Sequence, residues 1–173
     1  MSKKLSETSL EELWQLFPIC LTEHNENWAA WYADEEKYLK GNLPADRIKR
    51  ISHIGSTAVK GIWAKPIIDI LVEVSAESDL QQFKPILEQA GYLCMSEESE
   101  RLSFNKGYTE NGFAERVYHL HLRKAGNNDE LYFRDYLNAH PDVAKEYEKL
   151  KLKGEIANWR IGLPLKKLIM TPM

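Results

Sequence analysis

The segment Ile67 to Val74 is the feature that most constrains the fold of this chain. It is a nearly continuous apolar run that only Asp69 and Glu73 interrupt. Such a run is typical of a central strand that is covered on both faces. A carboxylate in a buried strand carries a large desolvation cost unless a cation or hydrogen-bond donors compensate it. We therefore expect Asp69 to serve ligand chemistry, and it is the first candidate catalytic residue.

Strand and helix patterns on either side of this segment predict a mixed order of elements. Period-two alternation and short apolar runs predict strands over 47–54, 92–95, 101–106 and 113–123. Helical spacing and terminal signals predict helices over 9–17, 27–40, 78–90, 129–139 and 142–153. Helices followed by mixed strands and then by further helices are typical of an α+β fold, here a mixed β-sheet flanked by helices.

The ends of three predicted helices rest on identifiable residues. Pro18 ends the first helix, and Gly41 follows the last turn of the second. Ser78 and Gln81 have the spacing of a capping box for the 78–90 helix. Pro85 is expected to kink that helix or to delay its start.

Length and composition place the chain among single-domain globular proteins. Its 173 residues are predicted to form one domain, 1–173. The formal net charge of −3 does not favour binding of duplex nucleic acid, which requires a basic face. No stretch reaches the roughly 18 apolar residues of a membrane span, which predicts a cytoplasmic protein without membrane contact. Cys20 and Cys94 lack C-x-x-C spacing and are predicted to be reduced thiols.

A Gly-Ser turn directly after the 47–54 strand is the first candidate ligand site. Gly55, Ser56 and Thr57 follow that strand, and twelve residues separate Ser56 from Asp69. Glycine permits close approach of the backbone, and a nest of N–H groups attracts an anion. We therefore expect Gly55, Ser56 and Thr57 to bind phosphate, with Asp69 on the next strand near a metal ion.

Two cationic residues are candidate auxiliary phosphate ligands. Lys65 stands at the entrance of the 67–74 strand, where it is either a phosphate ligand or an ordinary surface lysine. Arg116 stands beside a pair of histidines, and a guanidinium binds phosphate bidentately. The alternative for Arg116 is an ion pair with an acidic neighbour.

The triplet His119-Leu120-His121 offers metal ligands. At positions i and i+2 of a strand the imidazoles share a face about 7 Å apart at Cα and can converge on one ion. Asp69 is the expected third ligand, whereas the Cα of Glu73 lies about 13 Å from it and the two cannot share an ion. Two imidazoles and a carboxylate indicate a divalent metal, although the pattern does not distinguish Mg, Mn and Zn. The alternative is a structural histidine pair.

The turn and the following strand together resemble the signature of the nucleotidyltransferase superfamily. That signature is a Gly-Gly or Gly-Ser turn, a spacer and then Asp-apolar-Asp or Asp-apolar-Glu. In the superfamily the two carboxylates hold two magnesium ions, and here Leu71 occupies the position of the second carboxylate. The resemblance implies that Asp69 is catalytic, and that the site is either degenerate or completed by ligands from elsewhere.

A more specific resemblance covers roughly residues 25–152. Its motifs, in chain order, are Trp28-x-x-x-Tyr32-x-x-Glu35, His53-Ile54-Gly55-Ser56-Thr57-Ala58-Val59-x-Gly61, Ala64-Lys65-Pro66-Ile67-Ile68-Asp69-Ile70-Leu71-Val72, His119-Leu120-His121-Leu122 and Phe133-Arg134-Asp135-Tyr136-Leu137. With these motifs the chain resembles the GrpB family, also filed as an uncharacterised protein family. The resemblance implies a nucleotidyltransferase-like core, an intracellular bacterial setting and no settled biochemical activity.

Two positions depart from the pattern of that family. Lys60 stands where the family usually has proline, which adds a charge beside the Gly-Ser turn. The tail from Asn158 onward lacks the expected Tyr-Thr-x-x-Lys segment, for which Lys166 or Lys167 are substitutes.

The leading functional hypothesis is binding of a nucleoside triphosphate or another phosphorylated small molecule together with a divalent metal. If the protein is active, it transfers a nucleotidyl group to a hydroxyl acceptor. The alternative is a non-catalytic module that binds a ligand or a partner and retains the fold, which Leu71 supports. A metal-dependent phosphate-ester hydrolase ranks last, because the sequence offers no evident general base.

Overall fold

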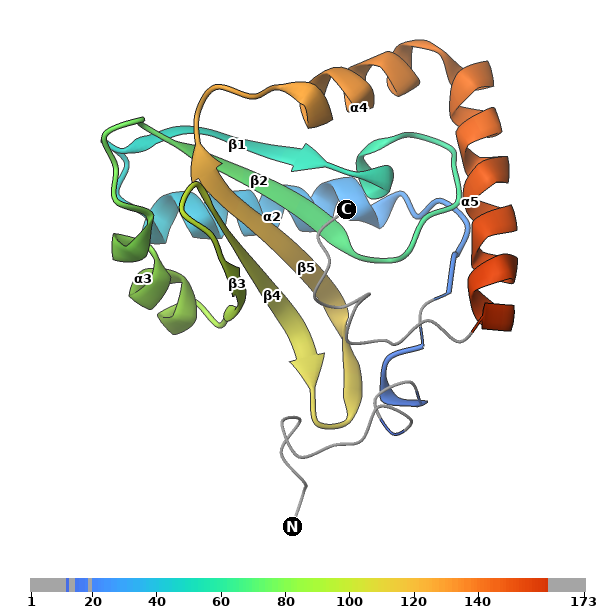
Figure 1. Ribbon diagram of the computed structural model, residues 1–173, viewed down its shortest axis with the longest axis horizontal. Helices are drawn as coiled ribbons and strands as arrows, with labels where there is room; N and C mark the ends of the chain where they lie inside the picture. The colour runs from blue at the N-terminus through green and yellow to red at the C-terminus, as the bar shows by residue number, and fades with distance from the viewer. Residues whose placement is uncertain (1–11, 13–14, 19, 162–173) are drawn as a thin grey trace.

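The structure of the chain is a computed structural model, which describes residues 12, 15–18 and 20–161, the last seven of them by backbone alone. The described residues form five strands and four α-helices (Figure 1). The strands are β1 (Ile48–Ile54), β2 (Ile68–Val74), β3 (Leu93–Glu97), β4 (Arg101–Thr109) and β5 (Gly112–Lys124). The helices are α2 (Asn27–Asn42), α3 (Lys84–Gln89), α4 (Asp129–Ala139) and α5 (Pro141–Ile161). Two short 3₁₀ helices are η2 (Ser56–Ala58) and η3 (Leu80–Gln82).

The strands form one mixed sheet in the order β1-β2-β5-β4-β3. β2 runs parallel to β5 and antiparallel to β1, and the β5–β4 and β4–β3 pairs are antiparallel. The α+β fold with a mixed sheet and flanking helices is therefore confirmed. β2 lies between β1 and β5, as the apolar run at its centre predicts.

The two faces of the sheet differ in chemistry because side chains alternate along each strand. On one face Ile68, Ile70, Val72 and Val74 of β2 pack in the main core with residues of α2 and α3. In Figure 1, α2 passes behind β2. The opposite face carries Asp69 and Glu73 of β2. On this face the α4 helix packs beside β1, at the edge of the sheet. A sheet with one apolar and one polar face places the chemistry of the chain on the second.

Several element boundaries differ from the sequence prediction for local reasons. The predicted 78–90 helix is divided into η3 and α3, and Pro85 lies in the first turn of α3, where the missing N–H costs nothing. Its cap is Asp79, whose carboxylate accepts from the amide of Gln81 at 3.0 Å, so the predicted Ser78 and Gln81 capping box is wrong. Ser78 instead pairs with the hydroxyl of Ser75 at 2.8 Å.

The β4–β5 hairpin is longer than predicted because Gly107 does not end the strand. Gly107 has φ +95° and lies at an irregularity in the pairing between Lys106 and Tyr108. A Cβ there would meet the carbonyl oxygen of Arg116 at 2.4 Å, so only glycine lets the strand continue through this bulge. The turn falls at 110–111, so of the two turn signals in the sequence, Lys106-Gly107 and Asn111-Gly112, only the second marks it.

Other expectations agree with the structure or fall partly outside it. The helices α2 and α4 form where they are expected, and α2 runs through Gly41 to Asn42. The α5 helix begins next to its predicted start but continues to Ile161, beyond the predicted end at 153, because Gly154 does not adopt the left-handed conformation that ends a helix. Residues 9–11, 13 and 14 of the predicted first helix lie outside the described residues, although Phe17 is buried against Tyr108 and Phe113. Cys20 and Cys94 are both free thiols. Among the described helices, none combines the length and the apolar character that crossing a bilayer requires.

Candidate functional site

The turn after β1 is pressed against the carboxylate of Asp69. Ile54 pairs with Asp69 in the β1–β2 register, and Gly55 follows with φ +72° and ψ −171°, a region essentially restricted to glycine. A Cβ on Gly55 would lie 2.5 Å from Oδ2 of Asp69. The turn continues into η2, where the amide of Ala58 donates to the carbonyl of Gly55 at 3.1 Å. Glycine is therefore required here both by the backbone angle and by the neighbouring carboxylate.

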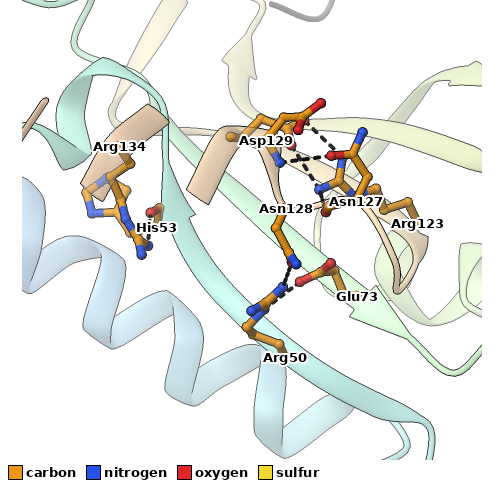
Figure 2. Close-up of polar contacts among 9 residues, drawn as sticks. Arg50, His53, Glu73, Arg123, Asn127, Asn128, Asp129 and Arg134 are labelled. Carbon is orange, nitrogen blue, oxygen red and sulfur yellow. Dashed lines mark hydrogen bonds and ion pairs between the residues drawn. The ribbon is translucent and has the colours of Figure 1, made fainter. Parts of the chain in front are cut away.

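The side chain of Thr57 links this turn to His53 of β1. Its hydroxyl lies 2.9 Å from Nε2 of His53, whose ring stacks on Tyr32 with centroids 4.8 Å apart. Burial lowers the pKa of His53 to about 4, so the ring is neutral. Arg134 of α4 donates to the carbonyl of His53 at 2.9 Å, and Figure 2 shows the two side by side. Because the buried Thr57 side chain is engaged with His53, the half-buried Ser56 is the hydroxyl better placed to meet a ligand.

Asp69 and the two histidines lie together, as the sequence predicts. The parallel register pairs Asp69 with His119 and Leu71 with His121, so the three side chains share the polar face. Oδ1 of Asp69 lies 3.7 Å from Nδ1 of His119 and 3.5 Å from Nε2 of His121. The Asp69 and His119 side chains are 26% and 21% exposed, whereas His121 is 3% exposed. The cluster is thus open to solvent at its Asp69–His119 end and closed beneath His121.

Residues of β4 determine which nitrogen of each imidazole faces Asp69. Nη2 of Arg101 lies 2.8 Å from Nδ1 of His121. A guanidinium only donates, so Nδ1 of His121 accepts and the ring proton is on Nε2. The hydroxyl of Tyr108 lies 2.9 Å from Nε2 of His119, which leaves Nδ1 toward Asp69. Burial lowers the pKa of His119, and the Asp69 charge opposes that shift in part.

These contacts bear on the predicted metal ligands. Within residues 12, 15–18 and 20–161, no group of three or more His, Cys, Asp or Glu side chains is arranged to hold a metal ion. Nε2 of His121 carries a proton and has no lone pair to give. Asp69 Oδ1 and His119 Nδ1 still fit a cation, because two bonds of roughly 2 Å can span the distance between them. Tyr108 would hold the other nitrogen of His119, as residues behind metal-ligating histidines commonly do.

Of the two predicted phosphate-binding cations, Lys65 and Arg116, only Lys65 lies near Asp69 and the histidines. Lys65 is half-buried near the cluster, since its charge contributes to lowering the pKa values of both His119 and Lys151. Lys151 of α5 donates to the carbonyl of Trp63 at 2.7 Å, and burial lowers its pKa to about 8. Of the two lysines, Lys65 is the one that places positive charge near the Asp69–His119 pair.

Arg116 is not brought to this site by the structure. It lies on the α2 side of β5, where it pairs with Asp34 at 3.0 Å and sits over the ring of Trp31. Positions of even number on β5, such as the core residue Tyr118, face α2, and the histidines at odd positions face the other way. The acidic-neighbour alternative for Arg116 therefore describes its position. Lys166 and Lys167 lie outside the described residues.

Leu71 and Glu73, the two β2 residues that share the face of Asp69, both have structural roles. Leu71, which occupies the place of a second carboxylate, is buried with Ile54 and Leu131 beneath α4. Glu73 is buried and accepts from Nε of Arg50 at 2.6 Å, while Arg50 also reaches the amide side chain of Asn128 (Figure 2). Glu73 thus belongs to a network that holds the start of α4 over β1.

Sequence reasoning missed the contributions of β4. Arg101, Ser103 and Asn105 alternate with Leu102 and Phe104, which is a signal of a strand with one polar face. In the structure Ser103 is paired with His121 and Asn105 with His119. The alternation was available from the sequence, but only the sheet order shows that this polar edge adjoins the histidines.

Comparisons with known proteins agree with the motifs of the chain. A family model described as GrpB protein matches residues 18–158. The Glutamate-rich protein GrpB of Alkalihalophilus pseudofirmus is 39% identical over 138 residues, which cover 77% of this chain and 79% of that protein. The UPF0157 protein YqkA of Bacillus subtilis is 36% identical over 154 residues, which cover 86% of this chain but 44% of YqkA.

A solved structure matches the fold as well. The crystal structure of the conserved protein GrpB from Enterococcus faecalis superposes with a TM-score of 0.68 at 32% sequence identity. The match covers 80% of this chain and 84% of that one. By the family model, the relatives and the shared fold, this chain is a member of the GrpB family, also called UPF0157.

Proposed function

We propose that this chain is a nucleotidyltransferase-like protein that binds a nucleoside triphosphate, or another phosphorylated ligand, with a divalent metal at the junction of β1, β2 and β5. The observation that carries the proposal is the contact between Gly55 and Asp69. A turn that presents its backbone beside a strand carboxylate places phosphate-binding amides next to a cation-binding oxygen.

Each residue has a defined part in this proposal. The amides at Gly55 and Ser56 hold the phosphates, because the first amides of a 3₁₀ helix have no acceptor within the helix. Lys65 adds positive charge near His119. Asp69 and His119 would hold the metal, which supplies neutralising charge for the phosphates. In transfer, an acceptor hydroxyl attacks the α-phosphorus in line and forms a new O–P bond, its proton passes to solvent, and the bond between the α- and β-phosphates breaks to release pyrophosphate.

A matched pair of glycine variants tests the phosphate turn. Gly55 and Gly61 both have φ +72°, but a Cβ on Gly61 meets nothing within 4 Å. Thermal unfolding of wild-type protein is measured with and without a nucleoside triphosphate and Mn²⁺, Mg²⁺ or Zn²⁺. A ligand that binds only the folded state raises the midpoint. We expect this rise for wild type and Gly61→Ala and its loss in Gly55→Ala. No rise with any combination, or an equal rise in both variants, contradicts the proposal.

A second candidate is a binding module without catalysis, and the position of Leu71 favours it. Leu71 is 1% exposed and packs with Ile54 and Leu131, so its place belongs to the core rather than to a second metal-binding carboxylate. Release of pyrophosphate separates the two functions. Ligand-dependent stabilisation without pyrophosphate release for any offered acceptor supports the module, whereas release that depends on Asp69 supports the transferase.

A further inference from the structure

Three polar side chains on the β4–β5 edge of the polar face are buried, and each has one donor atom without a hydrogen-bond partner. Ser103, Asn105 and His121 are 6%, 6% and 3% exposed. Ser103 pairs with His121 in the register of β4 and β5, and Asn105, two residues further along β4, pairs with His119. Oγ of Ser103, Nδ2 of Asn105 and Nε2 of His121 have no hydrogen-bond partner within the part of the chain that the structure describes, and neither has Nε of the adjacent Arg101.

Such a group of neighbours is unusual because buried polar atoms in proteins are nearly always paired. Each unpaired atom lowers the stability of the folded protein. Strand alternation directs all three side chains to the face that carries Asp69. The three unpaired atoms are explained if a ligand supplies the missing partner.

The chemistry of the three groups is that of neutral donors. Asn105 offers an amide N–H, Ser103 a hydroxyl, and His121 its Nε2–H, which the contact of Arg101 with Nδ1 fixes. The carboxylate of Asp69 lies 3.5 Å from Nε2 of His121 and is an acceptor. A ligand anion between them would be repelled by Asp69. A hydroxyl group fits, because it accepts from the donors and donates to Asp69.

We infer that Ser103, Asn105 and His121 form a donor row that binds the hydroxyl groups of a polyhydroxylated ligand such as a sugar beside Asp69, with Arg101 as the positioning residue for His121. This inference rests on the proposed function, in which a hydroxyl is the acceptor. The phosphates lie at Gly55 and Ser56, on the other side of Asp69. The partly exposed Asp69 and His119 side chains provide the approach.

The first test needs no ligand. Ser103 and Ser78 are 6% and 7% exposed, but Ser78 has a hydroxyl partner at 2.8 Å and Ser103 has none. Replacing an unpaired buried hydroxyl by alanine removes an unsatisfied group. We expect Ser103→Ala to unfold at the same or a higher temperature than wild type and Ser78→Ala at a lower one. An equal loss in both variants shows that Ser103 has a structural partner and overturns the inference.

The second test reads the ring of His121 directly. In the full chain with ¹⁵N-labelled histidine, long-range ¹H–¹⁵N spectra distinguish the two neutral forms of an imidazole. We expect His121 to carry its proton on Nε2 in wild type and to become a mixture of both forms in Arg101→Met. A proton on Nδ1 in the wild-type protein, or a spectrum that Arg101→Met leaves unchanged, removes Arg101 and His121 from the donor row.

The third test measures binding by calorimetry with ribose 5-phosphate, 2-deoxyribose 5-phosphate and inorganic phosphate. We expect wild type to prefer ribose 5-phosphate, and Ser103→Ala or Asn105→Leu to weaken that binding by about 3–10-fold, the worth of one hydrogen bond. Inorganic phosphate should bind these variants and Ser78→Ala as it binds wild type.

Failure of this inference and failure of the proposed function give different results. Phosphate binding that Gly55→Ala abolishes, with no preference among the sugar phosphates or an unchanged preference in Ser103→Ala, overturns the donor row alone. No binding of any phosphate compound to wild type overturns the proposed function, and the hydroxyl site falls with it.

Discussion

Gly55 and Asp69 are in such close contact that a single added methyl group at residue 55 would reach to within 2.5 Å of the Asp69 carboxylate. The contact joins the end of β1 to the start of β2. A side chain at residue 55 would therefore be opposed by two separate effects, the positive backbone φ angle and the crowding against the Asp69 carboxylate.

The two effects can be separated by their cost in stability. Gly55→Ala and Gly61→Ala both place a side chain at φ +72°, a backbone strain that costs about 1–3 kcal/mol. Gly55→Ala must in addition displace Asp69, and we expect a further loss of roughly 1–3 kcal/mol as for overpacking of a filled site. Urea denaturation of the two variants gives both values. Equal losses would mean that Asp69 moves aside freely.

Substitution of Asp69 is expected to affect ligand and metal binding, whereas substitution of Leu71 is expected to affect stability. Asp69→Asn should retain the fold and abolish stabilisation by ligand and metal, because it removes the charge and little volume. Leu71→Ala should cost about 2–5 kcal/mol through lost burial and the cavity it leaves. Calorimetric metal titration and chemical denaturation of both variants separate the roles. If Asp69→Asn binds metal normally and is strongly destabilised, Asp69 is a structural residue.

The buried His53 predicts an acid-sensitive component of stability. Its pKa is about 4 in the folded protein, mainly through burial, against an ordinary value of 6.5, with Asp69 and Arg134 as the charges that act on it. Between these values the unfolded chain binds a proton that the folded chain does not. The contribution of the neutral His53 ring to the free energy of unfolding is therefore complete above pH 6.5. It is lost as the pH falls toward 4.

The measurement for His53 is the free energy of unfolding across that pH range. Each unit of pKa displacement corresponds to about 1.4 kcal/mol. In His53→Gln, which can still bond to Thr57, the fall between pH 6.5 and 4 should be smaller than in wild type. Parallel curves for the two proteins would show that other groups carry the acid sensitivity.

Glu35 forms a buried pair on the opposite face of the sheet. Its Oε1 accepts from Nζ of Lys106 at 2.7 Å and from the hydroxyl of Tyr92 at 2.8 Å. Glu35→Ala leaves the Lys106 charge without its carboxylate partner, and we expect a loss of roughly 2–4 kcal/mol, reduced because Lys106 is partly exposed. The double variant Glu35→Leu with Lys106→Met should recover much of this loss in urea denaturation. No recovery would indicate that Tyr92, rather than the ion pair, accounts for the cost.

Much of the fold follows from local patterns in the sequence. The apolar run of β2 specifies a central strand because a segment that is apolar on nearly every residue must be covered on both faces. The family motifs and the alternation of His119 and His121 likewise specify which residues share a strand face. Helix ends were less certain, since Asp79 and Ser78 are both good caps and only the path of the chain selects Asp79.

The site itself depends on pairing between distant segments. The sequence by itself determined that Asp69, His119 and His121 are polar residues on strands, but their meeting requires the parallel register of β2 with β5, which no local pattern encodes. The same register places Arg116 on the other face and brings Arg101 and Ser103 of β4 to His121. Local periodicity fixes the face on which a side chain lies relative to its own strand, whereas the order of strands, set by burial of the whole core, decides which faces adjoin.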